Sequence, residues 1–289
     1  MNISVVIPAF NNAATISRAL KSTLTQSLRP TEVIVIDDCS KDGTVDIVRA
    51  IENDFRARGV ILKLLTSEKN SGGAVARNRG LSEAAGSVIS LMDSDDAWLP
   101  HHLQASVAVG IGRNCVVVSR TKQILAGGKV QILPKVRLGI GTNPLDYIFR
   151  GGGFIQTSSM VLFGHARQLR FDERLRKHQD FDFIAAAHKA DLPIFQRWDY
   201  SNEYHDYVGE TRVSVSKNLN ASRIFYLKWR TDLTRSARRA FLARFLAQQL
   251  PDNKIKMGRK LALGAMLDRE IVWQVRLRLL ARLLRGLVT

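Results

Sequence analysis

Short apolar runs alternate with longer amphipathic stretches over the first hundred residues of the chain. The runs are rich in β-branched residues and are bounded by polar or turn residues, which is typical of strands buried on both faces. They occupy residues 3–7, 32–36, 60–65 and 88–92. Between them, apolar side chains recur at helical spacing, which predicts helices at about 12–28, 44–58 and 73–85. This alternation predicts a mostly parallel sheet flanked by helices.

The pattern is less regular beyond residue 100. Apolar runs at 116–118 and 160–163 predict two further strands, and the glycine-rich stretch at 127–153 is not assigned to elements. From Ala221 onward, apolar residues recur at helical spacing. We therefore predict an α/β domain followed by a helical extension, at residues 1–215 and 216–289.

Acidic side chains follow the second and fourth predicted strands. Asp37 and Asp38 follow the second strand, and the fourth ends in Asp93, Ser94 and Asp95. The carboxyl ends of strands are where open α/β sheets bind ligands. Side chains alternate along an extended chain, so Asp93 and Asp95 project to one side and repel each other unless a cation lies between them or one is protonated. Carboxylate oxygens suit Mg²⁺ or Mn²⁺. A helix N-cap followed by a turn is the alternative explanation for these acids.

Two common nucleotide-binding motifs are missing from the sequence. No G-x-G-x-x-G follows the first predicted strand, and no G-x-x-x-x-G-K-[ST] occurs anywhere in the chain. Their absence disfavours a dinucleotide-dependent dehydrogenase and a P-loop enzyme.

Cysteine content and hydropathy predict the cellular setting. The 289 residues include two cysteines, Cys39 and Cys115, and no N-terminal secretory signal, which favours a reducing cytosolic setting with free thiols. No apolar run approaches the roughly 18–20 residues that a membrane span needs. We expect a soluble or peripheral protein.

The positive charge is concentrated near the C-terminus. The net charge is +17, and residues 216–289 contain 17 Lys or Arg against 4 Asp or Glu, which accounts for +13 of it. A basic helical segment suits anionic lipid head groups as well as nucleic acid. The lack of interleaved aromatic residues suited to base stacking disfavours nucleic acid.

Four ordered segments carry a resemblance to a known family. They read S-V-V-I-P-A-F-N, V-I-D-D-C-S-K-D-G-T, G-G-A-V-A-R-N-R-G and L-M-D-S-D-D, at residues 4–11, 35–44, 72–80 and 91–96. In this order they resemble the motifs of family 2 glycosyltransferases with the GT-A fold. The resemblance implies a Rossmann-like, mostly parallel sheet flanked by helices. It also implies transfer of a sugar from a nucleotide diphosphate, most often UDP, to an acceptor hydroxyl with inversion at the anomeric carbon.

The resemblance also implies roles for individual residues. Nucleotide-sugar contacts would come from six positions, namely Pro8, Phe10, Asp38, Arg77, Asp93 and Ser94. Phe10 would stack on the nucleobase and Asp38 would accept the base's N–H, although Phe10 by itself equally suits a core aromatic. Arg77 and Arg79 would reach the diphosphate or brace the acidic residues. Asp95 matches the metal-ligating position of the family. Cys39 stands where the family usually has glycine.

The second half of the chain resembles the acceptor side of the family. Gly151 to Ser159 is similar to the loop that lines the family's site. Asp180 matches the general base, although Gln179 stands where the family commonly has Glu, and Asp180 or Asp182 could instead be an ordinary first-turn acid favoured by the helix dipole. His205 resembles a residue that approaches the metal, with a surface or capping histidine as the alternative. No Q-x-x-R-W signature of processive synthases is present, which favours addition of a single sugar.

Two interpretations of the C-terminal helix remain open. Val272, Val275 and Leu279 form one face and arginines another, so the helix suits a membrane interface. Packing on the catalytic domain or on a second subunit of a homo-oligomer is the alternative.

We expect a cytoplasmic enzyme, peripheral on the inner membrane, that acts on a saccharide or lipid-linked saccharide in bacterial exopolysaccharide or cell-surface polysaccharide biosynthesis. The alternatives are a polyprenyl-phosphate sugar synthase and a non-catalytic nucleotide-sugar or nucleic-acid-binding protein.

Overall fold

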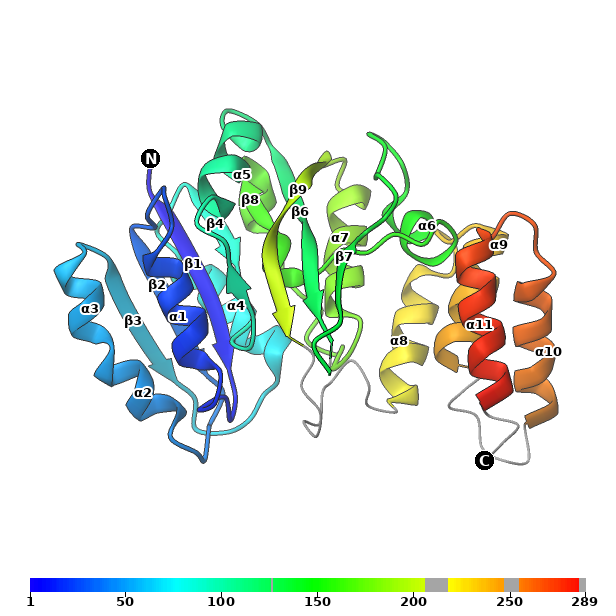
Figure 1. Cartoon of the computed structure of the whole chain (residues 1–289), viewed down its shortest axis with the longest axis horizontal. Coiled ribbons are helices and arrows are strands. Elements are labelled where there is room, and N and C mark those ends of the chain that lie inside the picture. Colours follow the sequence, from blue (N-terminus) through cyan, green and yellow to red (C-terminus); the bar gives the residue numbers. More distant parts are fainter. Residues whose placement is uncertain (126, 206–217, 247–254, 286–289) are drawn as a thin grey trace. The chain divides into compact units, whose positions relative to one another are not determined.

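The computed structural model describes residues 1–125, 127–205, 218–246 and 255–285, which belong to two compact units (Figure 1). Unit 1 comprises Met1–Leu133, Ile155–Glu173 and Ala186–Glu210, and unit 2 comprises Pro134–Phe154, Arg174–Ala185 and Thr211–Thr289. Unit 2 therefore gathers segments from both sides of residue 215. The domain boundary expected there lies outside the described residues and stays a prediction.

Unit 1 is built on one mixed sheet, which has nine strands among the described residues. These are β1 (Ile3–Ala9), β2 (Glu32–Asp37), β3 (Ile61–Thr66), β4 (Val88–Leu91), β5 (Ala97–Trp98), β6 (Cys115–Ile124), β7 (Val130–Leu133), β8 (Val161–Phe163) and β9 (Ile194–His205). Their order is β3-β2-β1-β4-β8-β6-β9-β5, with β7 paired to β6. Strands β3, β2, β1 and β4 are parallel, whereas β8 is antiparallel to both its neighbours. The predicted α/β architecture is confirmed.

The three helices predicted before residue 100 are present in unit 1 with shorter lengths, one of them divided in two. They are α1 (Ile16–Leu24), α2 (Thr44–Ala50) with α3 (Glu52–Ala57), and α4 (Gly73–Glu83), whereas the next helix, α5 (His102–Gly110), was not predicted. The prediction of a helix from residue 12 is wrong at its start, because the Asn12 carbonyl accepts the N–H groups of Thr15 and Ile16 in a turn. The helix predicted at 44–58 is divided at Ile51, whose backbone turns between α2 and α3.

A glycine brings α4 close to the sheet. Gly80 faces Val6 of β1 and Ile36 of β2, and a Cβ at this position would collide with both side chains. Close approach explains why this helix position carries no side chain. The contact fixes α4, and the side chains on its first turns, against the two strands that end in the candidate site.

Unit 2 consists of helices around an aromatic core. The helices are α6 (Pro144–Phe149), the first half of α7 (Gln179–Lys189), α8 (Leu219–Trp229), α9 (Arg235–Phe241) with a π-helical turn at Leu242–Leu246, α10 (Ile255–Met266) and α11 (Trp273–Arg285). The rings of Phe149, Phe225 and Phe241 contact one another at 5.1–6.1 Å between centroids, and His178 lies 5.4 Å from Phe225. Segments on both sides of residue 215 thus share one core. Among the described residues, no helix is both long and apolar enough to cross a lipid bilayer.

His178 gives this aromatic core a dependence on pH. Burial, assisted by the charges of Lys177 and Arg244, lowers the pKa of the imidazole from 6.5 to about 3. Its Nε2 lies 2.9 Å from the Ser222 hydroxyl. Between pH 6.5 and 3 this imidazole binds a proton in the unfolded chain but not in the folded chain. The titration of His178 therefore leaves the free energy of unfolding unchanged above pH 6.5 and lowers it as the pH falls from 6.5 toward 3.

We predict that the difference in stability between the wild type and His178→Asn shrinks on acidification. Asn tolerates the positive φ of 65° at this position. Between pH 7 and pH 5 the wild type should lose about 2 kcal/mol more of its free energy of unfolding than the variant, at about 1.4 kcal/mol per pH unit below 6.5. Urea unfolding at the two pH values measures this, with the exposed His165→Asn as control. Equal losses in wild type and His178→Asn would contradict the assignment.

Candidate functional site

Three parallel strand ends of unit 1 lie side by side. Strands β1 and β2 pair up to Ala9 and Asp37, and the Asp38 N–H donates to the Ala9 carbonyl at 2.8 Å. On the other side of β1, the Met92 N–H donates to the Val6 carbonyl at 3.0 Å. The residues that follow β1, β2 and β4 therefore emerge at one edge of the sheet, as expected for a ligand site of this architecture.

Asn12 links the loop after β1 to the acidic turn after β4. Its Oδ1 accepts the Phe10 N–H at 2.9 Å and the Ser94 hydroxyl at 2.7 Å. The sequence analysis did not select Asn12 for this role. A short polar residue two positions after an aromatic residue was the available signal, and it is equally typical of any turn.

Phe10 lies at the surface of this edge. It is 43% exposed, so the alternative interpretation as a core aromatic is wrong. Pro8 is buried within β1, where it pairs with Ile36, so its side chain shapes the strand end that presents Phe10. An exposed ring at a strand end offers a flat apolar face to a ligand.

Asp38 is buried and holds the turn that begins α4. Its two carboxylate oxygens accept the N–H groups of Ser71 at 2.8 Å and Gly72 at 2.6 Å. Each carboxylate oxygen can accept further hydrogen bonds, so the bonds to the turn do not exhaust it. The next residue, Cys39, has φ of 68°, a left-handed conformation that costs an L-residue about 1–2 kcal/mol and explains why glycine suits this position.

Arg77 braces the acidic turn. Its Nη2 donates to Asp93 Oδ1, and its guanidinium lies 5.3 Å from the centre of the Phe171 ring. Arg79 points elsewhere and donates to the Thr66 carbonyl at 2.8 Å. Of the two roles that the sequence left open for these arginines, Arg77 takes the bracing one, which stabilises the Asp93 carboxylate.

Asp95 is positioned through its backbone. The Arg18 guanidinium, from α1, donates to the Asp95 carbonyl oxygen. Asp95 lies two residues before β5, which pairs antiparallel with β9 at Ala97 and Glu203. Asp95 is two residues before Ala97 and His205 is two residues after Glu203, so both lie toward the same end of the antiparallel β5–β9 pair.

Asp96, which sequence reasoning did not select, lies beneath the turn and is 1% exposed. It accepts hydrogen bonds from the Ser158 hydroxyl and from Gln156 Nε2, the latter at 2.7 Å. The Ser158 oxygen in turn accepts the Asp93 N–H at 2.9 Å, and the Trp98 indole donates to the Ser158 carbonyl at 2.7 Å. This buried network fixes the backbone of the turn from below.

A neutral histidine supports Trp98. The rings of Trp98 and His102 stack with centroids 4.3 Å apart and planes at 17°. Complete burial, with the charges of Arg197 and His101, holds the pKa of His102 well below its usual range. Neutral His102 therefore packs as an aromatic ring, and its Nδ1 lies 2.9 Å from the Ser201 hydroxyl.

Two carboxylates lie in the first turn of α7, within unit 2, and their environments differ. Asp182 is buried, and its Oδ1 accepts the Trp229 indole N–H and the Lys228 ammonium, both at 2.7 Å. Asp180 is half-buried, and its Oδ1 accepts the Phe181 N–H at 2.9 Å. Asp182 is thus a structural acid, and Asp180 is the one more accessible to a ligand.

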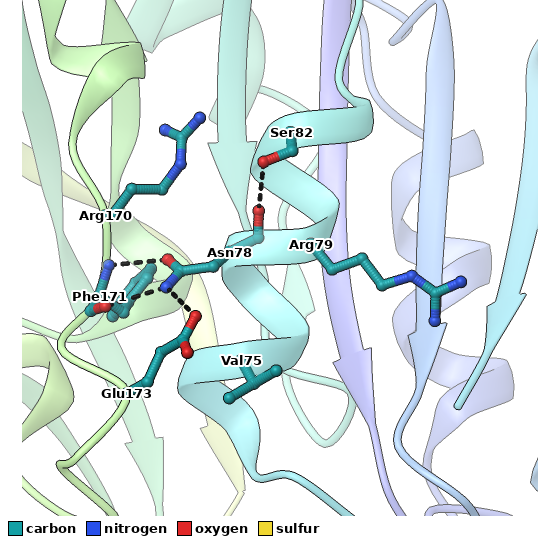
Figure 2. A pocket seen from close by; sticks show the side chains of 7 residues that line it. All are labelled: Val75, Asn78, Arg79, Ser82, Arg170, Phe171 and Glu173. Atoms are coloured by element: carbon teal, nitrogen blue, oxygen red, sulfur yellow. Dashed lines mark hydrogen bonds between the residues drawn. The ribbon is translucent and has the colours of Figure 1, made fainter. Parts of the chain in front are cut away.

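A groove of about 510 Å³ lies apart from these residues, on the outer side of α4 in unit 1 (Figure 2). It is lined by Val75, Asn78, Arg79, Ser82, Arg170, Phe171 and Glu173. The Asn78 side-chain amide joins α4 to the segment at residues 170–173, since it donates to the Phe171 carbonyl and to Glu173 Oε1, each at 2.9 Å. Of the residues that the sequence singled out, Arg79 lines this groove, whereas Pro8, Phe10, Asp38, Arg77, Asp93, Ser94 and Asp95 do not.

The chain was compared with protein families and curated proteins. The model of the family described as "Glycosyl transferase family 2" matches residues 4–174. The amylovoran biosynthesis glycosyltransferase AmsB of Erwinia amylovora is 34% identical over 65% of this chain and 64% of its own length. The succinoglycan biosynthesis protein ExoO of Rhizobium meliloti is 34% identical over 64% of this chain and 55% of its own length. The chain thus spans less than two thirds of the length of these relatives.

Solved structures share the fold at low sequence identity. Residues 1–349 of S. aureus TarS in complex with UDP-GlcNAc have a TM-score of 0.63 and 20% identity, covering 95% of this chain and 83% of that TarS segment. The mannosyltransferase PcManGT of Pyrobaculum calidifontis, in complex with GDP-Man and Mn²⁺, has a TM-score of 0.55 and 17% identity, covering 97% of this chain and 74% of PcManGT. The architecture is the expected GT-A fold. Because the family model covers more than half of the chain, and its matched segment contains the three strand ends and the acidic turn, the chain belongs to glycosyl transferase family 2.

Proposed function

We propose that this chain is an inverting, metal-dependent glycosyltransferase that moves one sugar from a nucleotide-diphosphate sugar, with UDP as the nucleotide, to a hydroxyl of a lipid-linked saccharide. The observation that carries the proposal is the acidic turn at residues 93–96, which is held rigidly beside Phe10 at the sheet edge. Its setting would be the cytoplasmic face of the inner membrane, in bacterial surface or exported polysaccharide assembly.

The relatives support the substrate classes. An Escherichia coli relative that is 36% identical over 39% of this chain and 42% of its own length is named a UDP-Glc:alpha-D-GlcNAc-diphosphoundecaprenol beta-1,3-glucosyltransferase. AmsB and ExoO are named for biosynthesis of the polysaccharides amylovoran and succinoglycan. These names motivate a UDP-sugar donor and a lipid-linked saccharide acceptor, whereas they give no support to a polyprenyl phosphate as the acceptor itself.

The donor would occupy the strand-end site. Phe10 would stack on the base, and the Asp38 carboxylate, fixed by the α4 turn, would accept the base's N–H. Asp93 would lie nearer the ribose, together with Ser94. Stacking of a base on an aromatic ring contributes roughly 1–3 kcal/mol in other systems.

Asp95 fits a divalent cation shared with a diphosphate. Within the described ranges, no three His, Cys, Asp or Glu side chains are grouped as a metal site. Mg²⁺ and similar cations at such sites usually take one or two carboxylates and complete their coordination with water and substrate phosphates, which suits Asp95 with His205 nearby. When bound, the cation would offset the negative charge of the departing diphosphate.

Inversion requires a base that removes the acceptor's proton. In one displacement the acceptor oxygen attacks the anomeric carbon from the side opposite the diphosphate, and its proton passes to a carboxylate. Asp180 suits this role better than Asp182, whose carboxylate already binds Trp229 and Lys228. The neighbouring Phe181 packs against His178, with ring centroids 5.7 Å apart, and would limit access of water to the carboxylate.

We predict that Asp180→Asn keeps the affinity for the nucleotide sugar within about twofold and lowers turnover by roughly 10²–10⁴-fold, because general base catalysis contributes about that much. Calorimetric titration and a transfer assay measure the two quantities. Asp182→Asn is the matched control, and it should lower stability while the folded fraction retains turnover. Unchanged turnover in Asp180→Asn would remove this residue from the mechanism.

Product analysis of the same reactions identifies the acceptor. Sugar attached to a lipid-linked saccharide agrees with the proposal, whereas sugar attached directly to polyprenyl phosphate would replace it with the synthase alternative.

We also predict that Ser158→Ala weakens metal-dependent nucleotide binding about tenfold, because Asp93 and Asp96 both lose a hydrogen bond to the Ser158 hydroxyl. Tenfold corresponds to about 1.4 kcal/mol. Titration of UDP with and without Mn²⁺ measures the effect. Ser159→Ala is the control, since this buried hydroxyl donates to the Gln156 carbonyl at 2.7 Å. If both variants lose metal-dependent affinity equally, the network does not act through the acidic turn.

A further inference from the structure

Helices α10 and α11 expose large apolar side chains to solvent. Leu263 on α10 and Leu267, one residue beyond the end of α10, are 51% and 71% exposed, and Trp273 and Leu277, one turn apart on α11, are 59% and 51% exposed. The two helices pack on each other as neighbours, joined by a connection at residues 267–272 (Figure 1). We call these four side chains the apolar stripe. Leucine and tryptophan at this exposure on adjacent helices are typical of an interaction surface.

The buried face of α11 shows that Trp273 and Leu277 of the stripe point outward. Val275 and Leu279 are at most 8% exposed, and the Val272 N–H donates to the Arg150 carbonyl at 3.1 Å. Gly152 packs against Val272 and Val275, since a Cβ added at this position would lie 3.5 and 3.6 Å from their methyl groups. One of the two sequence interpretations placed this face of α11 in a membrane interface, whereas the structure packs it inside unit 2, as the alternative interpretation expected packing within the protein. Its opposite side carries the stripe.

Basic residues surround the stripe. Residues 255–285 contain eight Lys or Arg and two acids. Arg259, Lys260 and Arg269 are exposed, the last of these in the connection between Leu267 and Trp273. Of the two acids, Asp268 is buried, where it binds Arg239 at 2.9 Å and the Ser236 hydroxyl at 3.0 Å. The other acid, Glu270, is exposed and lies 3.6 Å from the Arg150 guanidinium. The exposed part of this helix pair is therefore apolar with a net positive charge.

The positive charge around the apolar stripe helps to decide which partner the stripe binds, a second copy of the chain or a lipid surface. A second copy of the chain, related by a two-fold axis, would bring the same patch against itself and would place the basic residues of one copy against those of the other. An anionic lipid surface has the opposite charge, and its interface accommodates leucine and tryptophan side chains below the head groups. Charge complementarity thus favours lipid.

We infer that the apolar stripe docks unit 2 onto an anionic membrane surface, with Leu263, Leu267, Trp273 and Leu277 inserted and the basic side chains among the head groups. The functional role of this docking rests on the proposed function, because the proposed lipid-linked acceptor would lie in that membrane. Its evidence is independent, since no residue of the donor site takes part.

The test is co-sedimentation of the full-length chain with vesicles of phosphatidylglycerol and phosphatidylcholine, and with vesicles of phosphatidylcholine alone. The wild type should bind the anionic vesicles at least tenfold more strongly than the neutral ones. Leu267→Ser combined with Trp273→Ser should lower binding to anionic vesicles at least tenfold. Leu227→Ser is the matched control, because Leu227 of α8 is 49% exposed and lies outside the stripe, and it should bind like the wild type.

Fluorescence provides a second measurement on the same samples. Trp98 and Trp229 are 3% exposed, and the half-buried Trp198 belongs to unit 1, where the Arg120 guanidinium lies 4.4 Å from its ring centre. The change on binding should therefore come from Trp273 as a blue shift, and Trp273→Phe should abolish the shift while binding persists. The inference is overturned if the double variant binds vesicles like the wild type, or if the stripe variants instead abolish a concentration-dependent dimer. Calorimetric binding of UDP to the double variant should equal that of the wild type, so a failure of the docking surface remains distinguishable from a failure of the proposed activity.

Discussion

The acidic turn after β4 depends on one buried hydroxyl. Acidic residues at 93, 95 and 96 in four consecutive positions repel one another, and a backbone that gathers them must be held by donors. Ser158 holds the turn from below, since its hydroxyl oxygen accepts the Asp93 N–H and its hydroxyl proton is donated to the Asp96 carboxylate. Arg77 neutralises Asp93 from α4, and Arg18 holds the carbonyl of Asp95 from α1. With these contacts in place, the Asp95 side chain can serve a ligand.

The two units divide the proposed chemistry. Unit 1 carries the donor residues on a sheet whose parallel strands end together, and Asn12 ties the loop that presents Phe10 to the acidic turn. Unit 2 carries Asp180 on a helix whose neighbouring acid, Asp182, is committed to the core. Its outer helices add a basic and apolar surface suited to lipid. Helices on both sides of residue 215 share one aromatic core, so the basic C-terminal segment is part of a folded unit.

Local patterns in the sequence were sufficient for the α/β class and for the residues that follow β1, β2 and β4, whereas β5, β7 and β9 were not predicted. Uniform apolar runs marked β1, β2 and β4, and the acids after them marked the edge of the sheet. The supporting residues depend on long-range pairing, as between Asp96 and Ser158, which are 62 positions apart, and neither residue type is unusual in a loop. The sequence left the orientation of α11 undecided for a related reason. Both of its sides carry apolar residues, and only the contact with Gly152 and Arg150 determines which side is buried.

The most direct test of this account is calorimetric titration of the wild type with UDP, GDP, dTDP and CMP, each with and without Mn²⁺, repeated on Asp95→Ala. Asp46→Ala is the control, because its side chain is 85% exposed on α2. The account predicts that one nucleoside diphosphate binds only in the presence of Mn²⁺, that Asp95→Ala abolishes this dependence with at least a tenfold loss of affinity, and that Asp46→Ala behaves like the wild type. Failure of the wild type to bind any of the four nucleotides, or metal-dependent binding that survives in Asp95→Ala, would contradict it.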